Sequence, residues 1–275
     1  MSIIKCHCSV ICSIELLTGN TSLGKWSDAA PVVQLDRATD FGSVSWGFDS
    51  LRACQIFNSI MKKGLFITFE GIEGCGKSTQ ARLLRESLRS LRKDVLLTRE
   101  PGGPRISEEI RTILLNKEFT EMNRLTEVFL YMASRAQHTL EWIIPSLEKE
   151  QILICDRYYD STYAYQGAAR EIPENEIETI NTIATTGLKP DVTYIIDVPA
   201  EIGLERLHNG TKAEDIDRLE SEDIDFHRRV RTGYLELAEK EPDRVVVIDG
   251  TKNIEEIHQD IMKNITQRYK DLSGE

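Results

Sequence analysis

Five short apolar runs alternate with amphipathic segments after Met61, and this alternation is the feature that most limits the fold. The runs cover residues 65–69, 94–98, 151–156, 191–197 and 244–249. Continuous apolar runs of this length are typical of strands that are buried on both faces of a sheet. Helices between such strands predict an α/β fold in three layers, with a five-stranded parallel sheet flanked by helices.

The segments between the apolar runs carry helix signals. Residues 107–115 are predicted to form a helix with Ser107 as its N-cap. Residues 124–149 are predicted to form a long helix that bends or breaks at Pro145. No internal repeat or low-complexity linker interrupts residues 61–275, so we predict one domain there.

Residues 1–60 show no sustained helical or strand periodicity. Residues 38–53 can be back-translated into codons that resemble the paired arms of a transfer RNA. We therefore hypothesise that this region is a tRNA gene read as protein, and that the natural start is Met61. The alternative is a disordered, lineage-specific extension. On either hypothesis, residues 1–60 are expected to be an unstructured extension without a function of their own.

The composition excludes several classes of protein. A net charge of −11 argues against nucleic-acid binding, so any phosphate would have to be bound by a few local cations. No run of about 18 apolar residues is present, and we expect neither a membrane span nor a secretory signal peptide. The six cysteines have no paired metal-site spacing, which indicates a reduced, cytoplasmic protein.

The segment Gly71–Ser78 fits the phosphate-loop pattern G-x-x-x-x-G-K-[ST]. Its glycines let backbone N–H groups surround phosphate oxygens, and the following helix points its positive N-terminus at them. Lys77 would reach the β and γ phosphates of ATP, and the Ser78 hydroxyl would join the Mg²⁺ shell. A plain turn is the alternative, but the segment follows a strand and opens a helix, as the motif requires. The predicted ATP-binding residues are Gly71, Ile72, Glu73, Gly74, Cys75, Gly76, Lys77, Ser78 and Thr79.

A phosphate loop alone leaves open GTPases, motor ATPases and small-molecule kinases. A guanine-specific switch would need an N-K-x-D segment, and residues 116–119, NKEF, lack the aspartate. Asp156 ends the third apolar run and is followed at once by Arg157. This pair suits a kinase in which Asp156 supports Mg²⁺ and Arg157 binds an anionic acceptor. The alternative for the pair is a salt-bridged strand end.

Six segments, taken in order, resemble bacterial thymidylate kinase, which phosphorylates dTMP. They read FEGIEGCGKST, TREPGG, YMASRAQ, DRYYDSTYAYQG, LKPDVTYIIDV and DRLE, within about residues 64–269. Together they are far more specific than the phosphate loop alone. The resemblance implies a P-loop kinase fold with a mobile lid and transfer of the γ-phosphoryl group of ATP to dTMP. It also implies Mg²⁺ as cofactor and a homodimer.

The resemblance assigns roles around the acceptor nucleotide. Glu73 would lie near the ribose and phosphate of dTMP, and Arg99 would reach toward the acceptor phosphate. Tyr131 would stack on thymine, and Arg135, four residues further along the same helical face, would hydrogen-bond the base. Tyr165 would lie under the deoxyribose, where it leaves no room for a 2′-hydroxyl.

The remaining implied roles complete the site. Thr162 and Gln166 would read the base, and Arg218 and Glu220 belong to the lid that closes over ATP. The predicted catalytic residues are Lys77, Arg157, Arg218, Glu73 and Arg99. The predicted substrate-binding residues are Arg99, Tyr131, Arg135, Arg157, Thr162, Tyr165, Gln166 and Glu220, and the predicted metal ligands are Ser78 and Asp156.

The implied mechanism needs no general base, because the acceptor phosphate oxygen is already anionic. Catalysis would rest on positioning two anions and neutralising the transferring group. Some relatives carry an arginine inside the phosphate loop, where this chain has Gly74 and Cys75. The lid must then supply the cation, which we expect from Arg206, Lys212 or Arg218.

Two other functions stay open at this point. One is a phosphate-loop kinase for another nucleoside monophosphate, although a purine should not be read by Arg135, Thr162 and Tyr165. The other is a nucleotide-binding regulator without turnover, which would not require Lys77, Asp156 and Arg157.

Overall fold

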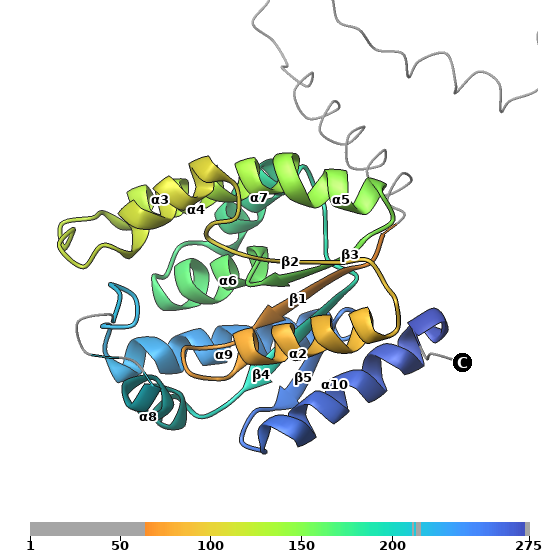
Figure 1. The fold of residues 1–275 in the computed structure, drawn as a ribbon. Coiled ribbons are helices and arrows are strands. Elements are labelled where there is room, and N and C mark those ends of the chain that lie inside the picture. Colours follow the sequence, from red (N-terminus) through yellow and green to blue (C-terminus); the bar gives the residue numbers. More distant parts are fainter. Residues whose placement is uncertain (1–63, 211, 213–215, 273–275) are drawn as a thin grey trace, which may run out of the picture. The chain divides into compact units, whose positions relative to one another are not determined.

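The computed structural model describes residues 64–210, 212 and 216–272, so the predicted extension 1–60 lies outside the described residues. The described part is an α/β domain whose five strands are all parallel, in the order β2-β3-β1-β4-β5 (Figure 1). Each predicted apolar run forms a strand, with boundaries shifted by about one residue. The strands are β1 Phe66–Glu70, β2 Val95–Arg99, β3 Ile152–Asp156, β4 Val192–Asp197 and β5 Val245–Asp249.

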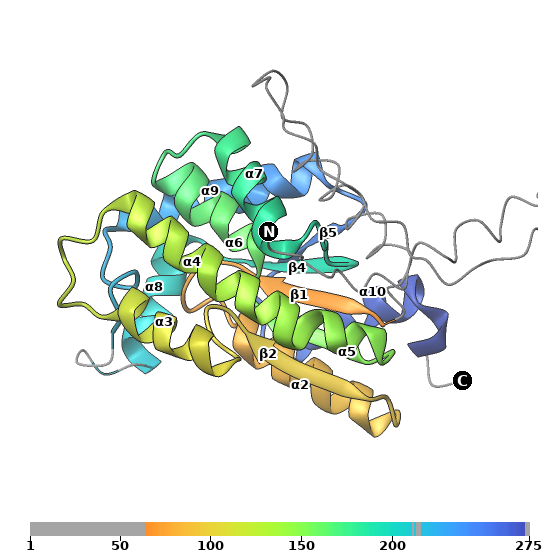
Figure 2. The same cartoon turned by 90° about the horizontal axis from the view of Figure 1, so that it is seen from above.

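Helices cover both faces of the sheet, which explains why the strands are continuously apolar. α2 (Lys77–Ser90) and α10 (Ile254–Arg268) pack together on one face, whereas α5 (Ile144–Glu148) lies over β3 on the other (Figures 1 and 2). α7 (Glu174–Thr185) and α9 (Ile224–Lys240) lie on the same face as α5, where both pack against η4. The other elements are α3 Arg105–Leu115, α4 Arg124–His138, η3 Thr139–Ile143, α6 Tyr159–Thr162, η4 Tyr163–Ala169, α8 Ala200–Gly210 and η5 Lys270–Leu272.

Two helix predictions are corrected or refined by the structure. α3 begins at Arg105, so the prediction of Ser107 as N-cap is wrong. Ser107 is fully buried inside α3, and its hydroxyl donates to the carbonyl oxygen of Ser134 in α4 at 2.8 Å. The sequence could not show this contact, because serine is common both at caps and between packed helices.

The predicted helix over 124–149 is broken, as expected, near Pro145. α4 continues into the π-helical turn η3, and α5 then starts with Pro145 in its first turn. Proline has no N–H and its ring collides with the carbonyl one turn earlier, so a regular helix cannot run through it. The π turn absorbs this mismatch and lets α4 and α5 follow one another along the sheet.

The strand register brings the ends of β1, β2 and β3 to one edge of the sheet. Asp156, the last residue of β3, pairs with Phe69 of β1 and with Arg99 of β2. Side chains that follow these strands therefore meet at a common place, although they are far apart in the sequence.

Candidate active site

A cavity of about 330 Å³ opens at the carboxyl-end edge of the sheet, where open α/β sheets bind their ligands. All the predicted substrate-binding residues and both predicted metal ligands line it, and of the predicted catalytic set only Arg218 does not. Its walls are formed by Glu73, Gly74, Lys77, Ser78, Arg99, Glu100, Pro101, Arg111, Leu115, Tyr131, Arg135, Asp156, Arg157, Ser161, Thr162, Tyr165, Gln166, Leu207, Asp217, Leu219 and Glu220.

The phosphate loop joins β1 to α2 and is held against α8. Gly74 has a φ of 66°, and a Cβ there would lie 1.9 Å from the carbonyl oxygen of Gly203. Only glycine allows this approach, because any side chain would push the loop away from α8. Lys77 is the first residue of α2, and its ammonium donates to the carbonyl oxygen of Ile72 at 3.2 Å, so the side chain folds back over the loop.

Five predicted ATP-binding residues of the loop do not line the cavity: Gly71, Ile72, Cys75, Gly76 and Thr79. Ile72 and Cys75 are buried in the core beneath the loop. Their side chains therefore anchor the loop, and only their backbone groups could contact a phosphate. The first N–H groups of α2 face the same end of the cavity, which suits an anion.

Ser78 and Asp156 meet at the mouth of the phosphate loop. The Ser78 hydroxyl donates a short hydrogen bond to Oδ2 of Asp156. Oδ1 of Asp156 is buried, and among the residues that the structure describes it has no hydrogen-bond partner. A buried carboxylate oxygen without a donor is costly unless a cation or a proton binds it. This pair thus fits one edge of a Mg²⁺ site, whose other ligands would be water and phosphate oxygens.

Arg157 follows β3 and is held in place by partners on both sides of its guanidinium group. Nη2 donates to Oε1 of Glu73 and to the hydroxyl of Tyr165, each at 2.9 Å. Nη1 donates to the carbonyl oxygen of Gly71 at 2.9 Å and to the hydroxyl of Tyr234 at 3.0 Å. The guanidinium also lies 4.9 Å from the centre of the Tyr165 ring, a cation–π distance.

Glu73 is the loop carboxylate beside Arg157. Burial alone would raise its pKa, but the Arg157 charge and a hydrogen bond from His227 outweigh burial and lower the pKa of Glu73 to about 2. His227, buried in α9, contacts Oε2 of Glu73 at 3.1 Å, and the Tyr165 hydroxyl donates a short hydrogen bond to Oε1. Glu73 is thus ionised at neutral pH, and the charge of Arg157 is matched before any substrate binds.

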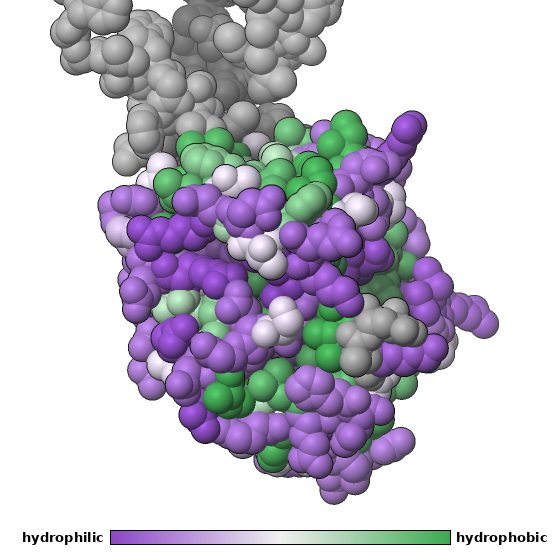
Figure 3. All heavy atoms as spheres, turned by 90° about the vertical axis from the view of Figure 1, so that its left-hand side faces the viewer, coloured by the Kyte–Doolittle hydropathy of each residue, from purple (hydrophilic) through white to green (hydrophobic). Residues whose placement is uncertain are grey.

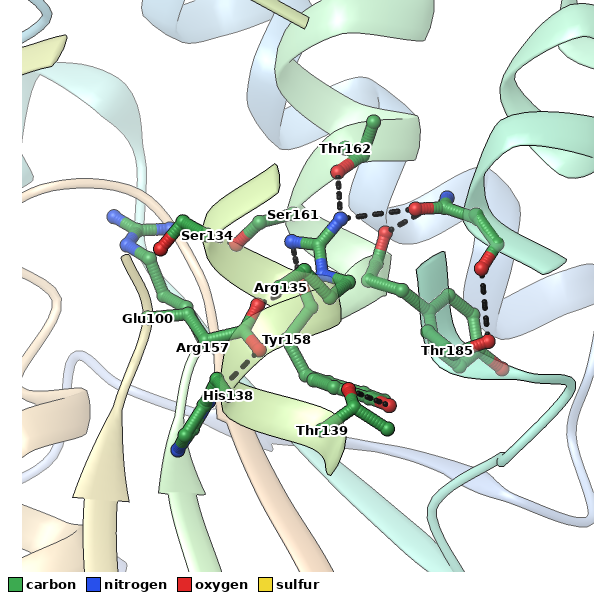
Figure 4. A network of polar contacts seen from close by, with 12 residues as sticks. Glu100, Ser134, Arg135, His138, Thr139, Arg157, Tyr158, Ser161, Thr162 and Thr185 are labelled. Atoms are coloured by element: carbon green, nitrogen blue, oxygen red, sulfur yellow. Dashed lines mark hydrogen bonds and ion pairs between the residues drawn. The ribbon is translucent and has the colours of Figure 1, made fainter. Parts of the chain in front are cut away.

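The far end of the cavity is built around Arg135, whose side chain is 2% exposed (Figure 4). Its Nε donates to Oε2 of Glu100 at 2.7 Å, and Nη2 donates to the carbonyl oxygen of Tyr158 at 3.0 Å. Nη1 donates to Thr162 Oγ1 at 2.6 Å and to Asn181 Oδ1 at 2.9 Å. These bonds use four of the five N–H groups of the guanidinium. Arg135 therefore faces the cavity as a fixed group with one spare donor.

The predicted base-reading residues surround this arginine. Tyr131 lies one turn before Arg135 on α4, as expected, and Thr162 is a hydrogen-bond partner of Arg135. Gln166 also lines the cavity, but its amide donates to Oε1 of the buried Glu127 at 2.9 Å. This bond fixes the plane of the amide and leaves its oxygen and its second N–H for a ligand.

Arg218 lies away from the phosphate loop. Its Nη2 is 2.7 Å from Oε2 of Glu127, and its Nε donates to the carbonyl oxygen of Leu114 at 3.0 Å. Burial would raise the pKa of Glu127, but Arg170 and Gln166, with Arg218, lower it. In this structure Arg218 therefore joins the lid to α3 and α4.

The rest of the lid segment is only partly described. Arg206, one of the candidate cations, lies in α8, and its Nη1 donates to the carbonyl oxygen of Gly250 at 2.8 Å. Contrary to the expectation from the sequence, Arg206 therefore does not belong to the lid, because α8 continues to Gly210. Neither Arg206 nor Lys212 lines the cavity. Glu220 does line it, and burial raises its pKa.

Arg99 extends from the end of β2 to Glu108 of α3, with Nη2 and Oε2 2.9 Å apart. Arg111, which the sequence analysis did not select, also lines the cavity and donates to the carbonyl oxygen of Pro101 at 2.9 Å. In the sequence Arg111 reads as a solvated residue of an amphipathic helix, so no local signal distinguishes it. The structure adds Arg111 to Arg99 and Arg157 as a cation that lines the cavity.

A set of buried polar residues, which no sequence pattern predicted, supports the site. Their partners are distant in the chain, which is why no spacing pattern marks them. The clearest sign in the sequence is a carboxylate at the end of an apolar strand. The set consists of Glu70, Glu100, Glu127, His138, His227 and Tyr234.

Comparison with known proteins shows which family the chain resembles. The family model described as thymidylate kinase matches residues 69–261. The thymidylate kinase of Pediococcus pentosaceus is 47% identical over 205 residues, which cover 74% of this chain and 98% of the relative. That of a Sulfurihydrogenibium species is 49% identical over 205 residues, with the same coverage. The crystal structure of thymidylate kinase from Ehrlichia chaffeensis superposes with a TM-score of 0.60 at 36% identity, covering 74% of this chain and 98% of that one.

Proposed function

Because the chain belongs to the thymidylate kinase family, we propose that it transfers the γ-phosphoryl group of ATP to dTMP, giving dTDP and ADP for dTTP synthesis. The observation that carries this proposal is the single cavity described above. It joins a phosphate loop at one end to Tyr131 and Arg135 at the other, with Arg157 and Tyr165 between them.

At the donor end, Lys77 exchanges its contact with the Ile72 carbonyl oxygen for the β and γ phosphates of ATP. The backbone N–H groups of the loop bind the same oxygens, and the N-terminus of α2 favours their negative charge. Ser78 and Asp156 would hold Mg²⁺, which when bound neutralises charge on the phosphates. The described residues contain no cluster of three or more acidic, His or Cys side chains able to bind a metal alone, so phosphate and water oxygens must complete its shell.

At the acceptor end, the thymine ring stacks on Tyr131 and accepts a hydrogen bond from the spare N–H of Arg135. Arg157 and Arg99 bind the dTMP phosphate, and Arg111 adds charge beside them. Tyr165 lies under the deoxyribose and excludes a 2′-hydroxyl. The preformed contacts among Arg135, Glu100 and Thr162 mean that little ordering is needed when the base binds.

The reaction needs positioning more than acid–base chemistry. The acceptor oxygen is anionic at neutral pH, so the main barrier is the approach of two negatively charged groups. Lys77 and Arg157 neutralise these groups from opposite sides. Arg218 and Glu220 of the lid close over ATP and keep out water, which would otherwise accept the phosphoryl group.

A coupled assay for ADP release separates this enzyme from a nucleotide-binding regulator. With ATP, Mg²⁺ and dTMP, the full chain should release ADP continuously, and it should release almost none when dTMP is omitted. Binding of ATP without dTMP-dependent release would favour the regulator. The presence of Lys77, Asp156 and Arg157 in one cavity favours an enzyme over a regulator without turnover.

The exposed faces of α3 and α4 support assembly into a homodimer. They carry exposed large apolar side chains, among them Ile106, Ile113, Leu125 and Phe129. α3 and α4 pack against each other, and Figure 3 shows apolar side chains gathered near the top of the molecule, where these helices lie in Figure 1. Such clusters usually mark an interface. Sedimentation should show a dimer that Phe129→Glu converts to a monomer, whereas a monomeric wild type would contradict the proposal.

We further propose that the protein acts in the cytoplasm on a small-molecule substrate and binds no nucleic acid, in line with its net charge of −11. Cys75 and Cys155 are buried free thiols, as expected in a reducing compartment. Among the described residues, no helix is long and apolar enough to cross a membrane.

The catalytic domain is proposed to span residues 61–275. A chain that starts at Met61 should keep full activity and the melting temperature of the full chain. A fall of several degrees would mean that residues 1–60 contribute to folding.

A further inference from the structure

A buried carboxylate lies behind Arg157, on the side away from the cavity. Glu70 is the last residue of β1, is fully buried and does not line the cavity. Its Oε1 accepts a hydrogen bond from the backbone N–H of Tyr158 at 2.7 Å. Its Oε2 accepts from the hydroxyls of Ser161 at 2.6 Å and Tyr234 at 2.8 Å. Glu70 thus has a donor on each oxygen, and two of its three donors are hydroxyl groups that can rotate.

The same two hydroxyls contact Arg157. Nη1 of Arg157 donates to Tyr234 Oη at 3.0 Å and to Ser161 Oγ at 3.3 Å. An ionised Glu70 has only acceptors, so both hydroxyls direct their hydrogens to it and turn lone pairs toward Arg157. Two carboxylates therefore bracket the guanidinium: Glu73 acts directly on Nη2, and Glu70 acts on Nη1 through two hydroxyls.

The two sides of the guanidinium differ in access to substrate. The partners of Nη2, Glu73 and Tyr165, line the cavity. On the Nη1 side Ser161 also lines it, but Tyr234 and Glu70 do not. An incoming phosphate can compete with Glu73 for Nη2, but it cannot reach the contacts of Nη1 with Tyr234. The Glu70 side therefore keeps Arg157 in place while its other side changes partner.

Protonation of Glu70 would alter this arrangement. Among the contacts described, the hydroxyls of Ser161 and Tyr234 on Oε2 are the groups that could accept the added proton, because the Tyr158 N–H on Oε1 is only a donor. At least one hydroxyl then has to turn its own hydrogen away from Glu70, toward the other hydroxyl or toward Arg157. The negative charge behind Nη1 is lost at the same time, so Arg157 is held less firmly.

We propose that Glu70 is a positioning residue, whose ionised carboxylate acts through Ser161 and Tyr234 to aim Arg157 at the acceptor phosphate, and whose protonation weakens acceptor use. This inference rests on the proposed function, in which Arg157 binds the phosphate of dTMP. Glu70 would thus contribute to the site although it does not contact the substrate.

The groups around Glu70 place its titration in the neutral range. Burial and, next, the charge of Asp160 in α6 raise the pKa of Glu70, Arg157 lowers it, and the result is about 7. Asp160 is itself paired with Arg244, which comes just before β5. The other neighbours do not titrate there, because burial raises the pKa of Cys155 in β3, of Tyr158 and of Tyr234 in α9 well above their usual values. Glu73, with a pKa of about 2, stays ionised throughout.

Glu70→Gln tests the proposal because glutamine copies the protonated form. Its oxygen can accept from the Tyr158 N–H, and its amide nitrogen is a donor where Oε2 was an acceptor. The readout is kcat/KM for dTMP from about pH 5.5 to about pH 9, expressed as the ratio of wild type to variant. The second ionisation of dTMP, near pH 6 for phosphate monoesters, affects both enzymes alike and cancels in the ratio.

The expected ratio is about tenfold at about pH 8, where about nine-tenths of Glu70 is ionised, and it falls to about two at about pH 6, where about a tenth is ionised. The midpoint should lie near pH 7. KM for ATP should not change, because Glu70 is remote from Lys77 and Ser78 in the contacts described. Glu174→Gln, at a surface carboxylate of α7 paired with Lys240, is the matched control and should give a ratio near one at every pH.

A ratio that is raised equally at all pH values would mean that Glu70 is only structural, and it would overturn the inference. Tyr234→Phe gives a second route if Glu70→Gln does not fold, because it removes one hydroxyl link and keeps the ring. Its ratio should rise over the same pH range by a smaller factor, and a flat ratio also overturns the inference. If the wild type does not turn over dTMP at any pH, the proposed function is wrong and the inference fails with it, whereas a flat ratio with an active wild type refutes the inference alone.

Discussion

Glu100→Gln should destabilise the protein strongly, because it leaves the buried Arg135 without its carboxylate. The side chains of Arg135 and Glu100 are 2% and 3% exposed, and Nε and Oε2 are 2.7 Å apart. Glu100 also accepts from His138 Nδ1 at 3.0 Å, so its charge serves two partners. Removing one member of a buried pair typically costs about 3–5 kcal/mol, because the remaining charge is uncompensated. Glutamine keeps the shape and one acceptor oxygen, but its amide nitrogen is a donor, so the change removes the charge and one of the two hydrogen bonds that Glu100 accepts.

The matched control is Glu174→Gln, which removes the same charge from an exposed pair. Glu174 and Lys240 are 61% and 54% exposed, and such pairs contribute about 0.2–1 kcal/mol. Urea unfolding of the full chain, followed by circular dichroism, gives both free energies of unfolding by linear extrapolation. In a domain of this size, the Glu100→Gln loss should lower the melting temperature by about 6–20 °C. A loss below about 1 kcal/mol, or one equal to that of the control, would refute the reasoning.

Three further predictions concern the site. Lys77→Ala should lower kcat/KM by about a hundredfold or more without changing the melting temperature, because the ammonium contributes charge rather than core volume; a collapsed melting transition would show a structural role instead. Tyr165→Ala should lower the preference for dTMP over ribothymidine monophosphate, since a 2′-hydroxyl forced against the ring costs about 1–3 kcal/mol; the ratio of the two kcat/KM values measures this, and an unchanged ratio would make Tyr165 a packing residue. Folding raises the pKa of Glu70 from 4.5 to about 7. The protonated carboxyl therefore stabilises the folded state below about pH 4.5, and this stabilisation is lost as the pH rises through 7. Glu70→Gln should therefore gain stability relative to wild type between about pH 5 and about pH 8, by up to roughly 3 kcal/mol in unfolding measurements, and a constant difference would contradict the raised pKa.

The sheet could be predicted from the sequence because its signal is local. Each strand is one continuous apolar run, so its position follows without knowledge of its neighbours. The phosphate loop was equally visible, since its glycines, Lys77 and Ser78 are adjacent in the sequence. The break near Pro145 followed from the chemistry of a single residue.

The buried polar residues that support the site could not be predicted, because their roles depend on contacts between distant parts of the chain. Glu70 meets Tyr234 across 164 positions, and Glu73 meets His227 across 154. In the sequence Glu70, Tyr234 and His227 read as ordinary polar positions, and Glu73 was predicted as a site residue without its partner His227. The prediction of Ser107 as an N-cap was wrong for the same reason, because its partner Ser134 lies on another helix. The roles of the individual side chains stay predictions.

An acceptor screen tests the central claim most directly. The full chain, ATP and Mg²⁺ would be combined in turn with each nucleoside monophosphate, and kcat/KM would be measured from ADP release. The account predicts dTMP as the best acceptor. The kcat/KM for dUMP, which lacks only the methyl group, should be about tenfold lower or more. The kcat/KM values for dCMP and the purine nucleotides should be at least about a hundredfold lower. A higher kcat/KM for any other nucleotide, or no dTMP-dependent release of ADP, would contradict the account.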